Sequence, residues 1–266
     1  MLDKGAKTLI LTTLAAGGVS FTVSALVIVG VCHVIHRSEA VPSLIEFYTS
    51  ESCINCPVAE NMLDKVLDHD SVPGVKPVFL EFHVEYGNKP GRKDPYASLH
   101  NLIRQGDYAL SSGKESVYTP QIIVDGSSLP MGSGPDAVLE AMKRAVDRPK
   151  LPIHVQLEQP QENQVTAHLK VADVVPPDAE IWLATVEDGV PNRALKFDKR
   201  GPETHRGVVR NLQMVKLTQV HDHERLGSIT IPLKPAWNRE NLRLVVFAQE
   251  TAPGPILALG QCDRIP

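Results

Sequence analysis

The feature that most constrains the fold is a pair of cysteines, Cys53 and Cys56, placed between two segments of different periodicity. The apolar run 44–48 precedes the pair and is typical of a β-strand, whereas apolar residues recur at helical spacing over 58–67. A Cys-x-x-Cys sequence at such a junction is typical of a redox motif. The chain is therefore expected to end a strand and begin a helix at these cysteines.

Residues 41–148 continue this alternation of patterns. The predicted elements after the first helix are a strand over 78–84, a weaker helix over 98–110, a strand over 121–124 closed by the turn Asp125-Gly126, and a helix that starts at Pro135. Strands that alternate with helices predict α/β layers. We expect an α/β domain over 41–148.

Residues 149–266 have a different character, because helical periodicity is nearly absent from them. The strand-like runs are 153–157, 165–171, 181–186, 208–217, 228–233 and 242–248, with prolines and glycines between them. Short strands at close intervals favour an all-β, sandwich-like domain over 149–266.

The spacing of the cysteines suits thiol chemistry. Unpaired N–H groups and the positive dipole end at a helix start stabilise a thiolate, which lowers the pKa of the first cysteine. Cys53 is therefore the candidate nucleophile, and Cys56, three residues on, is the candidate resolving thiol. The sequence leaves open where the helix starts between the two cysteines and Pro57.

Other pairings remain open. A structural disulfide between these cysteines closes a loop worth only about 2 kcal/mol, whereas a bridge from Cys53 to Cys262 is worth about 5 kcal/mol on the same estimate. A metal site would need further ligands, such as a histidine, because no second Cys-x-x-Cys occurs.

Several spaced motifs resemble domain-of-unknown-function family 1223, a family of exported bacterial proteins, also found in plants, with a thioredoxin-like fold. The motifs are Ile45–Pro57 with both cysteines, Phe82-His83-Val84-Glu85-Tyr86, Lys93-Asp94-Pro95-Tyr96, Tyr118-Thr119-Pro120-Gln121 and, more loosely, Thr204–Arg210. The chain departs from the family at Gly87 and Arg92, where tryptophans are usual. The resemblance implies a thioredoxin-like domain over 41–148 and no established reaction.

That fold, together with the place of the next predicted strand, implies roles for five further residues. Pro120 is expected to be cis and to dock substrate, with the backbone of Thr119 pairing with the substrate chain. Glu46, in the strand before the cysteines, is expected to accept the proton of the resolving thiol, unless it is an ordinary paired or solvated carboxylate. His83 is expected to shape a substrate groove with Tyr86 or to complete a metal site; a structural hydrogen bond is the simpler alternative.

The amino-terminal segment predicts export. Residues 8–35 contain no Asp, Glu, Lys or Arg and exceed the about 20 residues that cross a bilayer. Lysines precede the segment, so we expect residues 1–40 to form a transmembrane anchor, with the rest of the chain on the periplasmic side. A signal peptide cleaved after Ser38-Glu39-Ala40 is the alternative, which would leave a secreted or periplasmic protein.

The function predicted from these observations is thiol–disulfide exchange on envelope proteins, with protein thiols or disulfides as partners and no cofactor or bound metal. The formal net charge of −4 argues against a nucleic-acid partner. The alternative is a non-catalytic module that binds a metal or a peptide, or a purely structural envelope protein, since a fold does not by itself imply a function.

Overall fold

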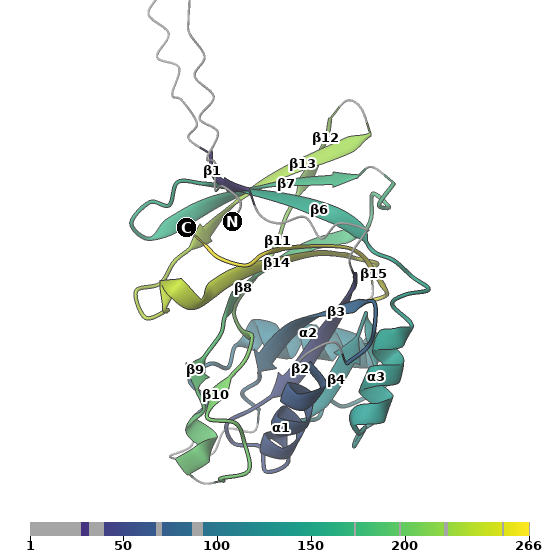
Figure 1. Ribbon diagram of the computed structural model, residues 1–266, viewed down its shortest axis with the longest axis vertical. Coiled ribbons are helices and arrows are strands. Elements are labelled where there is room, and N and C mark those ends of the chain that lie inside the picture. The colour runs from purple at the N-terminus through teal and green to yellow at the C-terminus, as the bar shows by residue number, and fades with distance from the viewer. Residues whose placement is uncertain are drawn as a thin grey trace, which may run out of the picture.

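A single mixed sheet organises the chain. The computed structural model describes residues 28–31, 40–67, 71–86, 93–172, 174–196, 198–220, 223–251 and 253–265. Within these residues the protein is mostly β, with a 13-stranded sheet whose strand order is β12-β13-β7-β6-β15-β14-β8-β11-β3-β2-β4-β5, and with β1 paired to β6. The sheet folds back on itself, so that its first strands form an upper layer over the middle ones (Figure 1).

The helices lie at one end of this sheet (Figure 1). There the strands are β2 (Val41–Thr49), β3 (Val75–His83), β4 (Gln121–Val124) and β5 (Ser127–Ser128), with β2 parallel to β3 and antiparallel to β4. The helices are α1 (Cys56–Leu67), α2 (Leu99–Ser111) and α3 (Pro135–Lys143). Side chains alternate along a strand, so one face of β2 packs on α1 and α3 through Ile45 and Phe47, and the other packs towards α2 through Leu44 and Tyr48.

The remaining elements are almost entirely strands. They are β1 (Ile28–Val31), β6 (Leu151–Glu158), β7 (Gln164–Ala172), β8 (Glu180–Glu187), β9 (Val190–Pro191), β10 (Thr204–His205), β11 (Val208–Met214), β12 (Leu217–Val220), β13 (Glu224–Pro232), β14 (Leu242–Gln249) and β15 (Ile256–Cys262), with short 3-10 helices at Arg193–Lys196 and Arg239–Asn241. Strands β9 and β10 form a separate two-stranded sheet.

The central strands β8 and β14 are buried on both faces, which explains their continuous apolar sequences. Leu183 and Leu244 join the core under β6, β7 and β13, whereas Ala184 and Phe247 face the core that also contains Tyr108 of α2. The two ends of the molecule therefore share the strands between them.

The predicted fold class, an α/β thioredoxin-like domain followed by a separate β-sandwich, is wrong. Strand β11 pairs in parallel with β3 through Val208 and Glu81, so one mainly β sheet runs through both regions. Local periodicity could not reveal this pairing, because it joins segments more than a hundred residues apart. The domain limits 1–40, 41–148 and 149–266 stay predictions.

The predicted transmembrane helix is also wrong. The described part of that segment, Ile28–Val31, is a strand antiparallel to β6, and its residues are β-branched except for a glycine. No helix among the described residues is long and apolar enough to cross a membrane. The apolar composition of 8–35 was compatible with a helix but did not require one. The membrane-anchored, periplasmic localisation derived from it is therefore not supported. Most of the segment, and residues 38–39 of the predicted cleavage motif, lie outside the described residues.

Candidate functional site

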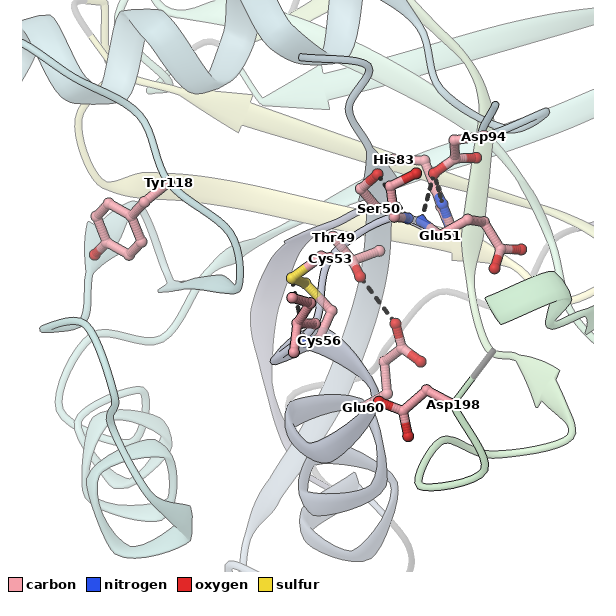
Figure 2. Close-up of a disulfide and its surroundings, with 12 residues drawn as sticks. Thr49, Ser50, Glu51, Cys53, Cys56, Glu60, His83, Asp94, Tyr118 and Asp198 are labelled. Atoms are coloured by element: carbon pink, nitrogen blue, oxygen red, sulfur yellow. Dashed lines mark hydrogen bonds and ion pairs between the residues drawn. A yellow bond between two sulfur atoms is a disulfide. The ribbon is translucent and has the colours of Figure 1, made fainter. Parts of the chain in front are cut away.

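The two cysteines form a disulfide at the start of α1 (Figure 2). Their Cα atoms are 5.4 Å apart. Cys53 lies before the first helical residue and is partly exposed, whereas Cys56 is the first helical residue and is fully buried. The observed bridge excludes a Cys53–Cys262 pairing.

The sulfur of Cys53 is the one that the helix start can stabilise. The backbone N–H of Cys56 donates a hydrogen bond to Cys53 Sγ over 3.2 Å. An N–H aimed at sulfur favours the thiolate once the bridge is reduced. The helix therefore starts at Cys56, and the N–H group of this first residue points at the sulfur of Cys53.

Three of the predicted binding residues lie close to the end of β2. The Thr119–Pro120 peptide bond is cis, as expected. It directly precedes β4, whose first residue pairs with Tyr48, so the dipeptide lies beside the strand end that leads to the cysteines. Burial raises the pKa of the partly buried Tyr86 hydroxyl, and the side chains of Thr119 and Gln105 partly offset that rise. The structure therefore brings Tyr86 and Thr119 together.

Glu46 lies elsewhere. Its carboxylate accepts hydrogen bonds from Arg104 Nε and Nη2 over 2.7 and 2.9 Å, and from the hydroxyl of Tyr108 over 2.6 Å. It projects from the face of β2 towards α2, as Tyr48 does, and α1 covers the opposite face. Glu46 is thus the paired strand carboxylate of the alternative interpretation, and the structure does not bring it to the cysteines.

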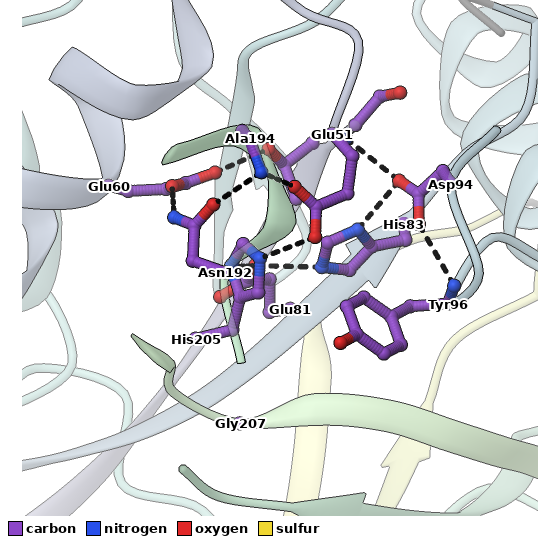
Figure 3. Close-up of polar contacts among 12 residues, drawn as sticks. Glu51, Glu60, Glu81, His83, Asp94, Tyr96, Asn192, Ala194, His205 and Gly207 are labelled. Atoms are coloured by element: carbon purple, nitrogen blue, oxygen red, sulfur yellow. Dashed lines mark hydrogen bonds and ion pairs between the residues drawn. The ribbon is translucent and has the colours of Figure 1, made fainter. Parts of the chain in front are cut away.

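His83 belongs to a buried group of titratable side chains that the sequence analysis did not assemble (Figure 3). We call Glu51, Glu81, His83, Asp94 and His205 the histidine cluster. His83 Nε2 lies 2.9 Å from Glu81 Oε1, and His205 Nδ1 lies 2.8 Å from the same oxygen. On their outer sides, His83 Nδ1 lies 2.8 Å from Asp94 Oδ2, and His205 Nε2 lies 3.3 Å from Glu51 Oε1.

The outer carboxylates are fixed by the backbone. Asp94 accepts hydrogen bonds from the N–H groups of Glu51 and Tyr96, both over 2.9 Å. Glu51 accepts hydrogen bonds from the N–H groups of Arg193, over 2.8 Å, and Ala194. Because Glu51 lies two residues before the first cysteine, the cluster also anchors the loop that carries the disulfide.

The charges in the cluster shift each other's pKa values. Burial alone would lower the pKa of His83, but the Asp94 carboxylate and hydrogen bonds to Asp94 and Glu81 outweigh it and raise that pKa to about 9. Burial would raise the pKa of Glu81, but the adjacent His205 and His83 hold it well below its usual range. The cluster therefore contains charged groups at neutral pH despite its burial.

Glu60 lies beside the cluster, one turn of α1 after Cys56. Its carboxylate accepts hydrogen bonds from the hydroxyl of Thr49 over 2.8 Å and from the side-chain amide of Asn192 over 3.2 Å. Burial, helped by the negative charge of Glu81, raises the pKa of Glu60 to about 7. Glu60 is therefore a buried carboxyl group that can gain or lose a proton near neutral pH.

The chain matches a known protein family. The profile of a family described as protein of unknown function (DUF1223) matches residues 44–249. The chain belongs to this family. No curated protein matches it. The match confirms the resemblance drawn from the spaced motifs.

Two solved structures are similar to this DUF1223 protein. Protein AGR_C_4864 from Agrobacterium tumefaciens shares 22% identity, with a TM-score of 0.59 over 85% of this chain and 96% of the other. HBP35 of Porphyromonas gingivalis shares 15% identity, with a TM-score of 0.59 over 85% of this chain and 76% of the other. At these identities the likeness concerns the fold alone.

The members of the histidine cluster lie in or next to the motifs that resemble DUF1223, and this placement is the feature of the sequence that could have pointed to them. Glu51, His83 and Asp94 come from motifs of the first region, and His205 comes from the loosely matching motif of the second. Glu81 lies just before one of these motifs. The sequence shows that such residues recur in motifs, but not that they meet, because His205 reaches the cluster only through the two-residue strand β10.

Proposed function

We propose that the protein carries out thiol–disulfide exchange through Cys53 and Cys56, with protein thiols or disulfides as its partners. The observation that carries the proposal is the asymmetry of the disulfide. Cys53 is the partly exposed sulfur and accepts the N–H of Cys56, whereas Cys56 is buried. A nucleophile must be reachable by the client, and a resolving thiol need not be.

The exchange then proceeds in two steps. In the reduced protein, the Cys53 thiolate attacks one sulfur of a client disulfide, a mixed disulfide forms, and the other client sulfur leaves as a thiolate. The Cys56 thiolate next attacks Cys53 Sγ, the mixed disulfide breaks, and the second client thiolate leaves. Two electrons pass to the client, and the protein returns to the oxidised form; the reverse sequence oxidises a client dithiol.

Glu60 is the proposed proton acceptor for Cys56, in place of Glu46. The two residues lie four positions apart on α1, on the same side of the helix (Figure 2). Burial raises the pKa of Glu60 to about 7, which suits a group that accepts a proton at neutral pH. The role is tested by the resolving step: Glu60→Gln should slow release of the mixed disulfide without slowing its formation.

The client is proposed to bind next to the exposed face of the disulfide. Ile54, between the cysteines, is 63% exposed, and Tyr86 is 44% exposed. Thr119 and Pro120 are partly exposed beside the end of β2. In this proposal Pro120 contacts the client, the backbone of Thr119 pairs with the client chain, and Tyr86 holds Thr119 in place. His83 is buried and acts only through the loop.

The experiment is a glutathione titration of the protein, followed by mass spectrometry of the peptide that contains both cysteines. We expect a reversible couple within about −120 to −270 mV, the range of working oxidoreductases. The variants Cys56→Ser and Cys53→Ser form a matched pair. Cys56→Ser should accumulate mixed disulfides with a reporter protein, and Cys53→Ser should not.

The opposite results would identify a non-catalytic protein. A couple below about −300 mV indicates a structural bridge. Equal trapping by the two variants would remove the assignment of Cys53 as nucleophile. Binding of a peptide by the oxidised protein without exchange would support the alternative, a binding module.

A further inference from the structure

Three donor atoms of the histidine cluster converge on one point in the interior. Glu81 and His83 are two residues apart on β3 and therefore project from the same face, and His205 approaches them from β10 (Figure 3). One donor atom from each of the three residues lies within 4.8 Å of the others, and His83 Nε2 and His205 Nδ1 both contact the same Glu81 oxygen. Each of the three side chains is at most 3% exposed.

The outer nitrogen of each ring is held by a carboxylate. The Asp94 carboxylate contacts His83 Nδ1, and the Glu51 carboxylate contacts His205 Nε2. Both carboxylates also accept hydrogen bonds from backbone N–H groups. When the inner nitrogens lose their protons, each offers a lone pair on the side of Glu81, while the outer nitrogens keep theirs on the carboxylates. Histidines that bind metals are oriented by carboxylates in this way.

One of the inner nitrogens has no aligned hydrogen-bond partner. His205 Nδ1 lies 2.8 Å from Glu81 Oε1, but the two groups are not oriented as a hydrogen bond. A misaligned contact gives less stabilisation than a hydrogen bond of good geometry, and native proteins rarely leave a buried polar atom in this condition. A cation bound by both the ring and the carboxylate would give His205 Nδ1 an aligned partner.

We infer that Glu81, His83 and His205 bind one zinc ion, with Asp94 and Glu51 orienting the two rings. Two imidazoles and one carboxylate are a donor set that zinc accepts, with the fourth position left for water or another ligand. Tetrahedral donors at zinc distances lie about 3.4 Å apart, so the Glu81 carboxylate moves outward by about half an ångström. Zinc replaces the protons that the inner nitrogens carry in the free protein.

The site is separate from the disulfide. Both cysteines are bound to each other in the oxidised protein and offer no thiolate to a metal. His205 also lines a pocket of about 430 Å³, together with Phe79 and Glu203. We therefore expect the oxidised protein and the variant Cys53→Ser/Cys56→Ser to bind zinc, although neither has a free thiolate at these positions.

The test is a titration of the oxidised, chelator-treated protein with Zn²⁺ by calorimetry, repeated with Co²⁺ to record its visible absorption. We expect one equivalent per chain and a higher Tm with zinc. His205→Gln should lower the affinity at least about 100-fold, and Glu51→Gln about 10–100-fold. His168→Gln is the matched control, because His168 lies 2.7 Å from Glu158 in a partly exposed pair. The His168→Gln variant should bind zinc with the affinity of the wild type.

Several results would overturn the inference. The first is that zinc does not bind at one equivalent per chain. The second is that His168→Gln and His205→Gln lower the affinity for zinc equally. The third is that the double variant Cys53→Ser/Cys56→Ser loses zinc binding while His205→Gln keeps it. If His205→Gln does not fold, an unchanged affinity in Glu51→Gln decides against the site. Zinc binding by the cysteine double variant, together with failure of thiol trapping, would reject the exchange function alone.

Discussion

Two buried polar groups lie on opposite faces of the strands β2 and β3, and they are built differently. On the α2 side, Glu46, Arg104, Tyr108 and Gln249 form what we call the arginine cluster. Arg104 donates to Glu46 and, through Nη2, to Gln249 Oε1 over 2.9 Å, while Gln249 Nε2 donates to Tyr108 over 2.8 Å. One positive charge meets one negative charge, and each donor named here has an acceptor.

The histidine cluster on the other side has neither property. Three carboxylates surround two imidazoles, and His205 Nδ1 lacks an aligned partner. A saturated, neutral group holds a fold together, whereas an acidic group with an unsatisfied nitrogen stays ready to exchange a proton or a cation. The arginine cluster thus has the composition of a stabilising group, whereas the histidine cluster has the open position that the proposed zinc site requires.

The largest expected effect is on the arginine cluster. Arg104→Met leaves the Glu46 carboxylate buried without its cation, and removal of one partner of a buried pair lowers the free energy of unfolding by about 3–5 kcal/mol. Chemical denaturation at pH 7 measures the change.

The matched control is the double variant Glu46→Leu/Arg104→Met, which removes both charges. Replacement of a buried pair by apolar residues is often nearly neutral, so the double variant should recover most of the loss. A double variant as unstable as Arg104→Met would show that the cluster acts through packing and not through its charges, and would weaken the comparison.

The next effect concerns the pH dependence of stability beside the histidine cluster. Burial raises the pKa of Glu60 from 4.5 to about 7, so the folded state holds this proton more tightly than the unfolded state. Its contribution to stability is fully present below pH 4.5 and is lost as the pH rises towards 7, by up to about 3 kcal/mol. Glu60→Gln should therefore gain stability relative to the wild type across this window.

Denaturation of both proteins at several pH values checks this expectation. Glu115→Gln, which removes one exposed carboxylate, serves as the control. A difference between Glu60→Gln and the wild type that stays constant from pH 4.5 to 7 would show that Glu60 does not titrate in this range.

Much of the local structure could be predicted from the sequence around the cysteines. Apolar spacing indicated β2, α1, β3, α2, β4 and α3, because each segment buries one face against its neighbours and so carries the period of its element. The parallel pairing of β11 with β3 could not be predicted, since nothing local distinguishes a strand at the edge of one sheet from a strand that joins two regions. Strand β15 was missed as well, because it follows a proline-glycine turn near the chain end.

The candidate site divides in the same way. The cysteine pair follows from adjacent residues and the cis Thr119–Pro120 bond was expected from the family resemblance; both are found in the structure. The sequence could not show that Glu46 lies away from the cysteines and that Glu60 is the better candidate for the proton acceptor. Which face of β2 meets α1 depends on the register of the whole sheet. After Asp94, the described chain passes through six further strands, β4 to β9, before His205 reaches its partners.

A smaller loss is expected when the histidine cluster loses an outer carboxylate. Asp94→Asn keeps one acceptor oxygen but replaces Oδ2, which receives Glu51 N–H and faces His83 Nδ1, by an amide nitrogen. We expect the free energy of unfolding to fall by about 2 kcal/mol, the cost of leaving such groups unsatisfied. A loss larger than that of Arg104→Met would reverse the comparison and make the histidine cluster the structural one.

The smallest effect calibrates the others. Lys170 and Glu224 form an ion pair of 2.6 Å between β7 and β13, with 49% and 41% of their side chains exposed. Solvent screens such pairs, so Lys170→Ala should lower the free energy of unfolding by less than about 1 kcal/mol. This pair is as short as the contacts in both buried clusters, but its side chains are partly exposed and theirs are buried. A loss comparable to that of Asp94→Asn would mean that contact distance, and not burial, sets the stability of charged pairs in this protein, and the contrast between the two clusters would then need another cause.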